Sequence, residues 1–169
     1  MDQNLENKIE LKERIIIFCK KNKLKIYLFI NFLLIFIASM FFWEQNKNKK
    51  NSLIAEKFIT ADLFLSSNNS ESAKKILQEI ILSKNKFYSI LALNTILENN
   101  LISDKKIILE YFNILQKINF TEETQDIIAL KKALYLIKVL DTKTGNNLLT
   151  EIIKKDSNIK SIALDILGK

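Results

Sequence analysis

The residues of this sequence that could do chemistry are its carboxylates, its lysines and one cysteine, because the chain has no histidine. Histidine is the commonest general base and metal ligand, so its absence excludes Ser-His-Asp and Cys-His arrangements and the usual zinc sites. Glu122 and Glu123 are adjacent, but they are better explained as the acidic start of a helix than as an acid/base pair. The other carboxylates are spaced as on ordinary solvated helix faces: Glu79, Glu98, Asp104 and Glu110.

Neither phosphate-loop nor disulfide chemistry has residues to support it. The chain has only two glycines, so a glycine-rich phosphate loop is absent. Cys19 has no partner for an intramolecular disulfide; it could be acylated beside a membrane, and an inert apolar residue is the simpler interpretation. We therefore predict no catalytic residue, no metal, no cofactor and no enzyme activity. An envelope enzyme without recognisable motifs is the alternative from another functional class.

One apolar stretch organises the rest of the chain. Residues 26–43 contain 18 residues without charge, Pro or Gly. As a helix they would extend roughly 27 Å, close to the hydrocarbon thickness of a bilayer. Tyr27 and Trp43 sit at its ends, where amphipathic rings favour the headgroup layer, and Lys23 and Lys25 precede it. The stretch predicts a transmembrane anchor. A buried core helix or a cleaved signal peptide fits less well, since the segment is long and ends in bulky residues.

The charges around this stretch predict its orientation. Residues 1–25 carry seven Lys or Arg, and the outer window 44–62 carries four. This bias favours a cytoplasmic N-terminus and a C-terminal domain across the membrane. We therefore expect a single-pass protein of the bacterial inner membrane with a periplasmic domain. The basic leader 1–25 could also form a short helix on anionic lipid, or it could be a frayed tail that only sets topology.

Two polar residues, Asn31 and Ser39, interrupt the apolar stretch. Asn31 and Ala38 lie on the same side of a helix. An amide at this depth favours a protein partner, so this face could contact a second transmembrane helix. The alternative is that the amide lies close enough to the interface to reach water.

The net charge of +7 does not indicate nucleic-acid binding. It divides into +3 for the leader (seven basic against four acidic residues) and +4 for the tail (19 basic against 15 acidic). Arg14 is the only arginine, and no concentrated basic face is present. The many lysines fit the composition of an A/T-rich genome.

The tail is predicted to be helical throughout. A polar spacer, 44–51, is followed by apolar residues at helical spacing and by polar breaks. Helices are expected at about 52–66, 71–82, 87–98, 104–118, 122–140 and 144–155, and from 158 onwards. Their expected N-caps are Ser70, Ser103, Thr121 and Ser157.

These helices recur at a fixed interval. Alternate helices begin near residues 52, 87, 121 and 157, a period of 34 to 36 that is typical of stacked helical hairpins such as the tetratricopeptide repeat (TPR). Small residues fall where paired helices would cross: Ala61 with Ala73, Ala133 with Gly145, and Gly168 at the start of a fourth repeat. We expect a TPR-like α-solenoid of about three hairpins over 52–169; a generic helical bundle is the alternative.

The order of segments resembles one bacterial family. A basic leader, one anchor, a polar spacer and degenerate repeats are similar to the TPR-like inner-membrane proteins related to the YfgM subunit of the SecYEG translocon. Two segments carry the resemblance: SIALDILGK, which is similar to an Ala-rich helix late in those repeats, and FYSILALNTIL, which is similar to an earlier one.

The resemblance implies an interaction protein without enzyme activity. Its expected partners are the membrane, translocon subunits, and periplasmic chaperones or exported clients, and it would serve protein translocation. A scaffold for another envelope complex, such as cytochrome c maturation, is the alternative within the same class.

Overall fold

The computed structural model describes residues 13–18, 20–139, 141–155 and 157–168. Within these ranges the chain is helical with turns and contains no strand, which confirms the all-α class. Cys19 and the first half of the leader lie outside the described residues. The chain divides into two compact units, Met1–Lys50 and Asn51–Lys169, and each is considered by itself.

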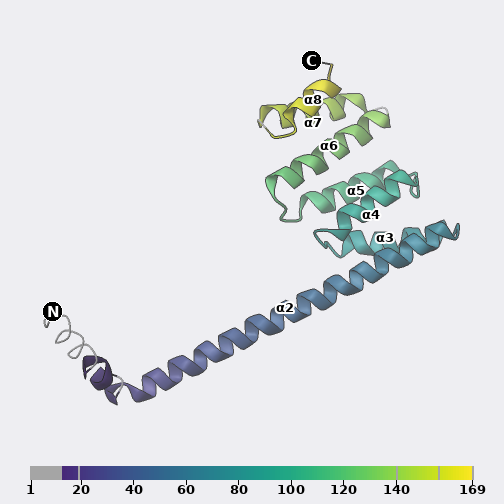
Figure 1. Ribbon diagram of the computed structural model, residues 1–169. Coiled ribbons are helices and arrows are strands. Elements are labelled where there is room, and N and C mark those ends of the chain that lie inside the picture. Colours follow the sequence, from purple (N-terminus) through teal and green to yellow (C-terminus); the bar gives the residue numbers. More distant parts are fainter. Residues whose placement is uncertain (1–12, 19, 140, 156, 169) are drawn as a thin grey trace, which may run out of the picture. The chain divides into compact units, whose positions relative to one another are not determined.

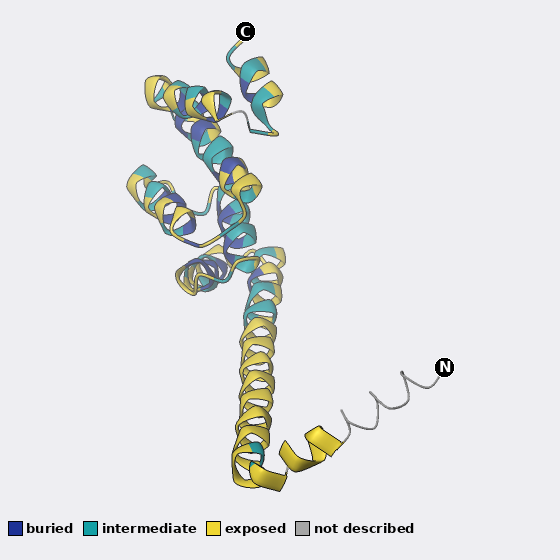
Figure 2. Cartoon of the chain, turned by 90° about the vertical axis from the view of Figure 1, so that its left-hand side faces the viewer, coloured by how far each residue is buried: buried dark blue, intermediate teal, exposed yellow. Residues whose placement is uncertain are grey.

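The first unit consists of helical residues 13–18 and 20–21, a turn at Asn22, and most of helix α2 (Lys23–Ser66). Its residues are almost all exposed and are coloured yellow in Figure 2. The most apolar 18-residue window of α2 is not buried inside the protein at all. By length and composition, α2 can cross a membrane, as the sequence predicted.

The expected break between anchor and tail does not occur. We predicted a polar spacer over 44–51 and a new helix from 52, but α2 continues through this segment without interruption. The segment contains no Pro or Gly, and Glu, Gln and Lys are good helix formers. Extending an existing helix by one residue costs far less than nucleating one, so the flanking helices propagate through the polar residues.

The second unit contains the end of α2 and six further helices. They are α3 (Ser70–Leu82), α4 (Tyr88–Glu98), α5 (Lys105–Gln116), α6 (Glu122–Lys138), α7 (Thr142–Lys154) and α8 (Lys160–Ile166). Figure 1 shows α3 to α8 stacked in chain order within this unit. The main packed pairs are α3 with α4 and α6 with α7, and α5 packs on α6.

The turns between helices use residues that accept a left-handed backbone. Asn68 and Asn100 have φ of 60° and 48° at the ends of α2 and α4, where the sequence predicted breaks. Asparagine tolerates this conformation better than most residues. Local chemistry therefore ends both helices without glycine.

Two predicted helix caps are wrong by one residue. Helix α3 is capped by Asn69, whose Oδ1 accepts from the Ser72 backbone N–H at 3.2 Å, and not by Ser70. Helix α5 is capped by Asp104, whose Oδ1 accepts from the Lys106 N–H at 2.8 Å, and not by Ser103. Asn, Asp and Ser are about equally good N-cap residues. Capping preference alone therefore did not decide which of the two neighbours caps each helix.

The two later caps differ from each other. Thr121 caps α6 as predicted, with its hydroxyl accepting from the Thr124 N–H at 3.4 Å. Ser157 does not cap α8, because that helix begins at Lys160 after Ile159. The Ser157 hydroxyl instead accepts from the Ile159 N–H within the preceding turn, at 3.4 Å.

Lys84 adopts an unfavourable backbone conformation that a substitution should relieve. It has φ of 56° in the turn after α3 and is exposed. A left-handed conformation costs an ordinary L-residue roughly 1–2 kcal/mol, and glycine avoids this cost. Glycine also loses more conformational freedom on folding, which cancels part of the gain in stability. Lys84→Gly is therefore expected to raise the free energy of unfolding by about 0.5–1 kcal/mol, measured by thermal unfolding of the full chain in detergent. Lys86→Gly in the same turn region is the control, and an equal gain from it would contradict the backbone explanation.

Two side-chain contacts define how the end of α2 meets α3. Lys57 Nζ lies 2.7 Å from Glu79 Oε2, and Asn85 Nδ2 donates to Asn51 Oδ1 at 2.8 Å. Both pairs are symmetric about residue 68, in the turn. The end of α2 and helix α3 therefore run antiparallel, as expected for a helical hairpin.

The core of the second unit has two clusters. The larger one joins residues of α2 to α6, among them Leu77, Ile96 and Phe112, and the smaller one joins α6, α7 and α8. Helix α6 contributes to both, with Ile128 in the first and Ala133 in the second. This helix therefore links the two halves of the apolar interior.

Candidate functional site

The residues predicted to lie at the membrane are all exposed. Tyr27 and Trp43 expose 73% and 77% of their surface, and Lys23 and Lys25 are exposed on α2. Their spacing along one apolar helix fits membrane interfaces at both ends of the span.

Asn31 and Ala38 lie exposed on α2, as a contact with a second membrane helix requires. The Asn31 side-chain nitrogen donates to the Tyr27 carbonyl oxygen at 2.9 Å, one turn earlier in the same helix. One of the two amide hydrogens is therefore satisfied locally, which lowers the cost of placing this amide in lipid. The contact with another helix stays a prediction.

The small residues predicted at helix crossings fall into different environments. Ala61, Ala73 and Ala133 are fully buried. A Cβ added to Gly145 would lie 2.6 Å from Ile137 Cγ1 and 2.8 Å from the Ala133 backbone oxygen. Helices α6 and α7 thus approach each other at Ala133 and Gly145 too closely for any side chain at the glycine.

Gly168 has a different role from the one expected. Its φ is +69°, and no described atom lies within 4 Å of an added Cβ. The position needs glycine for its backbone conformation after α8, and not for close packing.

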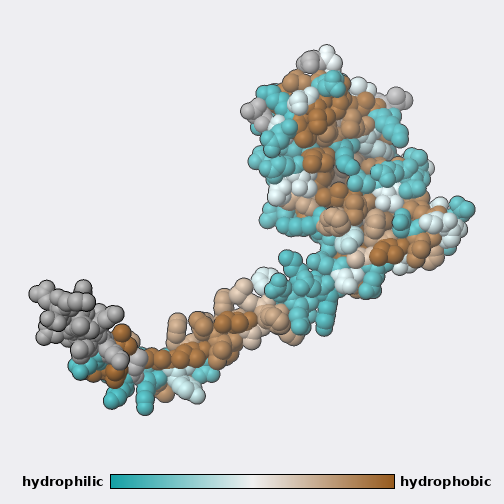
Figure 3. Space-filling view, in the orientation of Figure 1, coloured by the Kyte–Doolittle hydropathy of each residue, from teal (hydrophilic) through white to brown (hydrophobic). Residues whose placement is uncertain are grey.

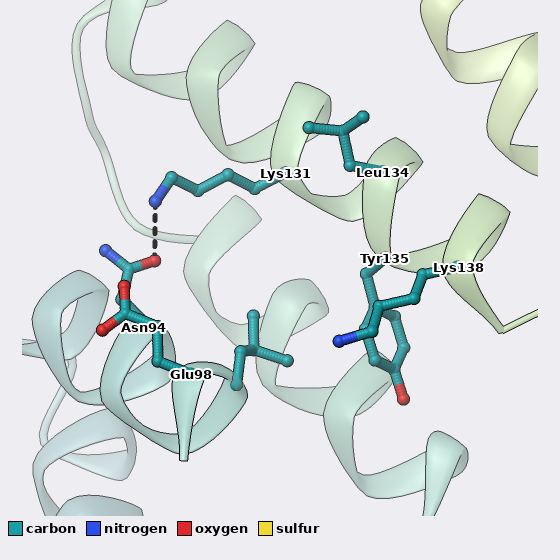
Figure 4. Close-up of a pocket in the computed structure, with 7 residues that line it drawn as sticks. Asn94, Glu98, Lys131, Leu134, Tyr135 and Lys138 are labelled. Carbon is teal, nitrogen blue, oxygen red and sulfur yellow. Dashed lines mark hydrogen bonds between the residues drawn. The ribbon is translucent and has the colours of Figure 1, made fainter. Parts of the chain in front are cut away.

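A groove lies on the surface of the second unit between α4 and α6. Its volume is about 250 Å³. Figure 4 shows residues of both helices around it, with Asn94 and Glu98 on α4 opposite Lys131, Leu134, Tyr135 and Lys138 on α6; Leu97 completes the lining. The groove combines an apolar floor with charged groups on both walls.

One hydrogen bond crosses the groove. Lys131 Nζ donates to Asn94 Oδ1 at 2.8 Å. The two residues are 37 positions apart, about one repeat. Another contact spans a similar sequence separation outside the groove: Lys105 Nζ lies 3.4 Å from Asp141 Oδ2, 36 positions away.

Tyr135 connects the groove to the core. Its ring centroid lies 6.0 Å from that of the buried Phe112, at a tilt of 42°. Burial raises the pKa of the Tyr135 phenol above its ordinary value, and the charge of Asp104 adds to the effect. The phenol is therefore neutral at physiological pH, and its ring forms part of the apolar floor.

The lysines of α6 are held by neutral groups. Lys131 bonds the Asn94 amide, and Lys132 Nζ bonds Asn113 Oδ1 at 2.9 Å and Gln116 Oε1 at 3.0 Å. Burial lowers the pKa of Lys132. Within the described part of the chain, Lys138 has no ion-pair partner and neither Lys131 nor Lys132 pairs with a carboxylate. The ammonium groups of Lys131, Lys132 and Lys138 thus form no close ion pair within these residues.

Sequence reasoning missed a buried carboxylate. Asp126 is 3% exposed on α6, and Lys155 Nζ lies 3.8 Å from its Oδ1. Asp126 is seven residues before Ala133, so it shares the buried face of the helix. That spacing is the signal that could have identified it. Lys155 follows α7, so this ion pair joins the first turns of α6 to the end of α7.

The carboxylates considered for catalysis do not converge. Glu79 pairs with Lys57, Asp104 caps α5, and Glu98 lies in the groove. Glu122 and Glu123 occupy the first turn of α6, where the helix dipole favours them. Among the described residues, no group of three or more Cys, Asp or Glu could hold a metal ion.

The chain matches no protein-family model, no curated protein and no solved structure. Arguments on its function therefore rest on its residues and their geometry.

Proposed function

We propose that this protein is a membrane-anchored, TPR-like interaction protein that serves as an accessory of the Sec translocon and the periplasmic chaperone network. The observation that carries the proposal is the pair of contacts one repeat apart, Asn94 with Lys131 and Lys105 with Asp141. They bring α4 beside α6 and the start of α5 beside the start of α7. In a solenoid of helical hairpins, corresponding helices of neighbouring repeats stack in this way.

A solenoid of this kind suits binding and not catalysis. Its stacked helices present a continuous surface to an extended chain or a partner helix. Figure 3 displays apolar side chains gathered in a band over the stacked helices of the second unit, flanked by polar ones. Apolar surface rimmed by polar groups is typical of protein-binding sites.

The proposed topology is single-pass, with the N-terminus in the cytoplasm and the C-terminal domain in the periplasm. It rests on the apolar window of α2 and on the seven basic residues before it. A reporter that is active only in the periplasm, fused after residue 169, is expected to be active. Protease digestion of the tail in inside-out vesicles but not in spheroplasts would refute the topology.

The proposed translocon partnership rests on the family resemblance and is tested by covalent capture. A photo-crosslinking amino acid at Leu134, in the groove, is expected to capture translocon subunits, periplasmic chaperones or exported chains when the full protein is purified in mild detergent. The same amino acid at Glu151, on the exposed side of α7, is the control. Specific capture of cytochrome c maturation factors, or of no protein at either position, would refute the partnership.

A further inference from the structure

We propose that the α4–α6 groove binds a segment of a partner protein that presents one large apolar side chain between two carboxylates. This inference rests on the proposed interaction function and adds the chemistry of the partner. Three features of the groove carry it: an apolar floor, two lysines at fixed spacing, and an acidic residue on the opposite wall.

The floor offers a place for an apolar side chain. Leu97, Leu134 and Tyr135 line it, and Leu134 exposes 42% of its surface although it lies between buried turns of α6. A volume of about 250 Å³ lies below the range of roughly 300–1,000 Å³ that drug-sized ligands occupy. It suits a leucine- or phenylalanine-sized side chain better than a small-molecule cofactor.

Two lysines place positive charge on the α6 wall of the groove. Lys131 and Lys138 lie three residues before and four residues after Leu134, so all three share one stripe of α6. Lys131 Nζ donates to a neutral amide, and neither lysine forms an ion pair within the described residues. Carboxylates of a bound segment could pair with both ammonium groups while its apolar side chain covers Leu134.

Glu98 on the α4 wall sets the orientation of the bound segment. It is exposed at the groove and carries no ion pair among the described residues. An acidic residue placed beside it would be repelled, so the carboxylates of the partner must face α6. A polyanion such as a nucleic acid, which presents charge in all directions, fits this arrangement less well.

A direct binding experiment tests the proposal. The full chain is placed in nanodiscs of zwitterionic lipid, and fluorescence anisotropy is measured with a labelled alanine-based peptide of twelve residues. The peptide carries one leucine, a glutamate three residues before it and another four residues after it. Saturable binding of this peptide is expected, and its absence at millimolar concentrations would overturn the proposal.

The variants identify the groove as the binding site. Lys131→Gln with Lys138→Gln should weaken binding about fivefold to tenfold, the effect of two partly exposed ion pairs. Lys106→Gln with Lys143→Gln removes the same charge from exposed positions elsewhere and should change binding less than about twofold. Equal effects of the two double variants would show that net charge alone acts, and the proposal would fail.

A charge exchange separates specific pairing from loss of folding. Lys138→Glu should reject the glutamate peptide and bind the peptide whose second glutamate is replaced by lysine. The protein should stay folded with only a small drop in melting temperature, because Lys138 is exposed and its one favourable role is that of a cation in the last turn of α6. If the exchanged pair gains no binding over the mismatched pair, carboxylates do not bind at Lys138.

The outcome is distinct from that of the proposed function. Peptide binding without capture of any translocon subunit, periplasmic chaperone or exported chain would leave the groove chemistry intact and refute the partnership. Capture at Leu134 without peptide binding would keep the partnership, but it would show that the partner enters the groove without pairing carboxylates to Lys131 and Lys138, which refutes the groove chemistry.

Discussion

Replacing Phe112 with alanine is expected to lower the free energy of unfolding by about 3–5 kcal/mol. Phe112 is 1% exposed on α5 and is the largest fully buried side chain of the described residues. Its removal would leave a cavity in the larger core cluster and would take away the ring against which Tyr135 packs. The groove floor should loosen with the core. Thermal unfolding of the full chain in detergent, followed by circular dichroism, measures the loss.

The matched control for this substitution is Phe87→Ala. Phe87 exposes 64% of its surface at the start of α4, so its loss should cost about 0.5 kcal/mol or less. Peptide binding gives a second readout, because Phe112→Ala should weaken it through Tyr135 even below the melting temperature. Similar stability losses for the two variants would contradict the assigned core.

Gly145→Ala is expected to destabilise the protein although alanine is the better helix former. Inside a helix this change normally gains up to about 1 kcal/mol. Here the new Cβ would lie 2.8 Å from the Ala133 backbone oxygen, which cannot move without shifting α6. Overpacking of this kind costs roughly 1–3 kcal/mol, so a net loss of about 1–2 kcal/mol follows. Thermal unfolding again provides the measurement.

The control for the glycine substitution is Lys143→Ala. Lys143 is exposed two residues earlier on α7, so this change tests helix propensity without the crossing and should be near neutral. A Gly145→Ala protein more stable than the parent would mean that α6 and α7 do not approach each other at this position.

Local signals were sufficient for most of the helices. Apolar residues at helical spacing predicted α3 to α7 to within two residues at their ends. Asn68 and Asn100, both left-handed in the structure, marked the ends of α2 and α4. Such features depend on residues adjacent in sequence, so the sequence carries them in readable form.

Local signals failed where two competing local outcomes were close in energy. The spacer 44–51 is polar, and it was predicted to separate two helices, yet it is helical because helices on both sides propagate through it. The caps of α3 and α5 shifted by one residue for a similar reason: two neighbouring residues could each serve. The difference in capping free energy between two such neighbours is smaller than the free energy of packing the helices.

The sequence by itself determined an all-helical chain with one apolar helix long enough to span a membrane. Both features depend on the composition and spacing of residues that lie close together in the sequence. Only the tertiary structure decided which residues form a site. Asn94 and Lys131 are 37 residues apart, and Asp126 reaches Lys155 across a whole hairpin. Nothing near these residues in sequence marks them as partners. Their proximity results from the packing of α6 on α5 and on α7, and this packing depends on how apolar faces far apart in the sequence meet.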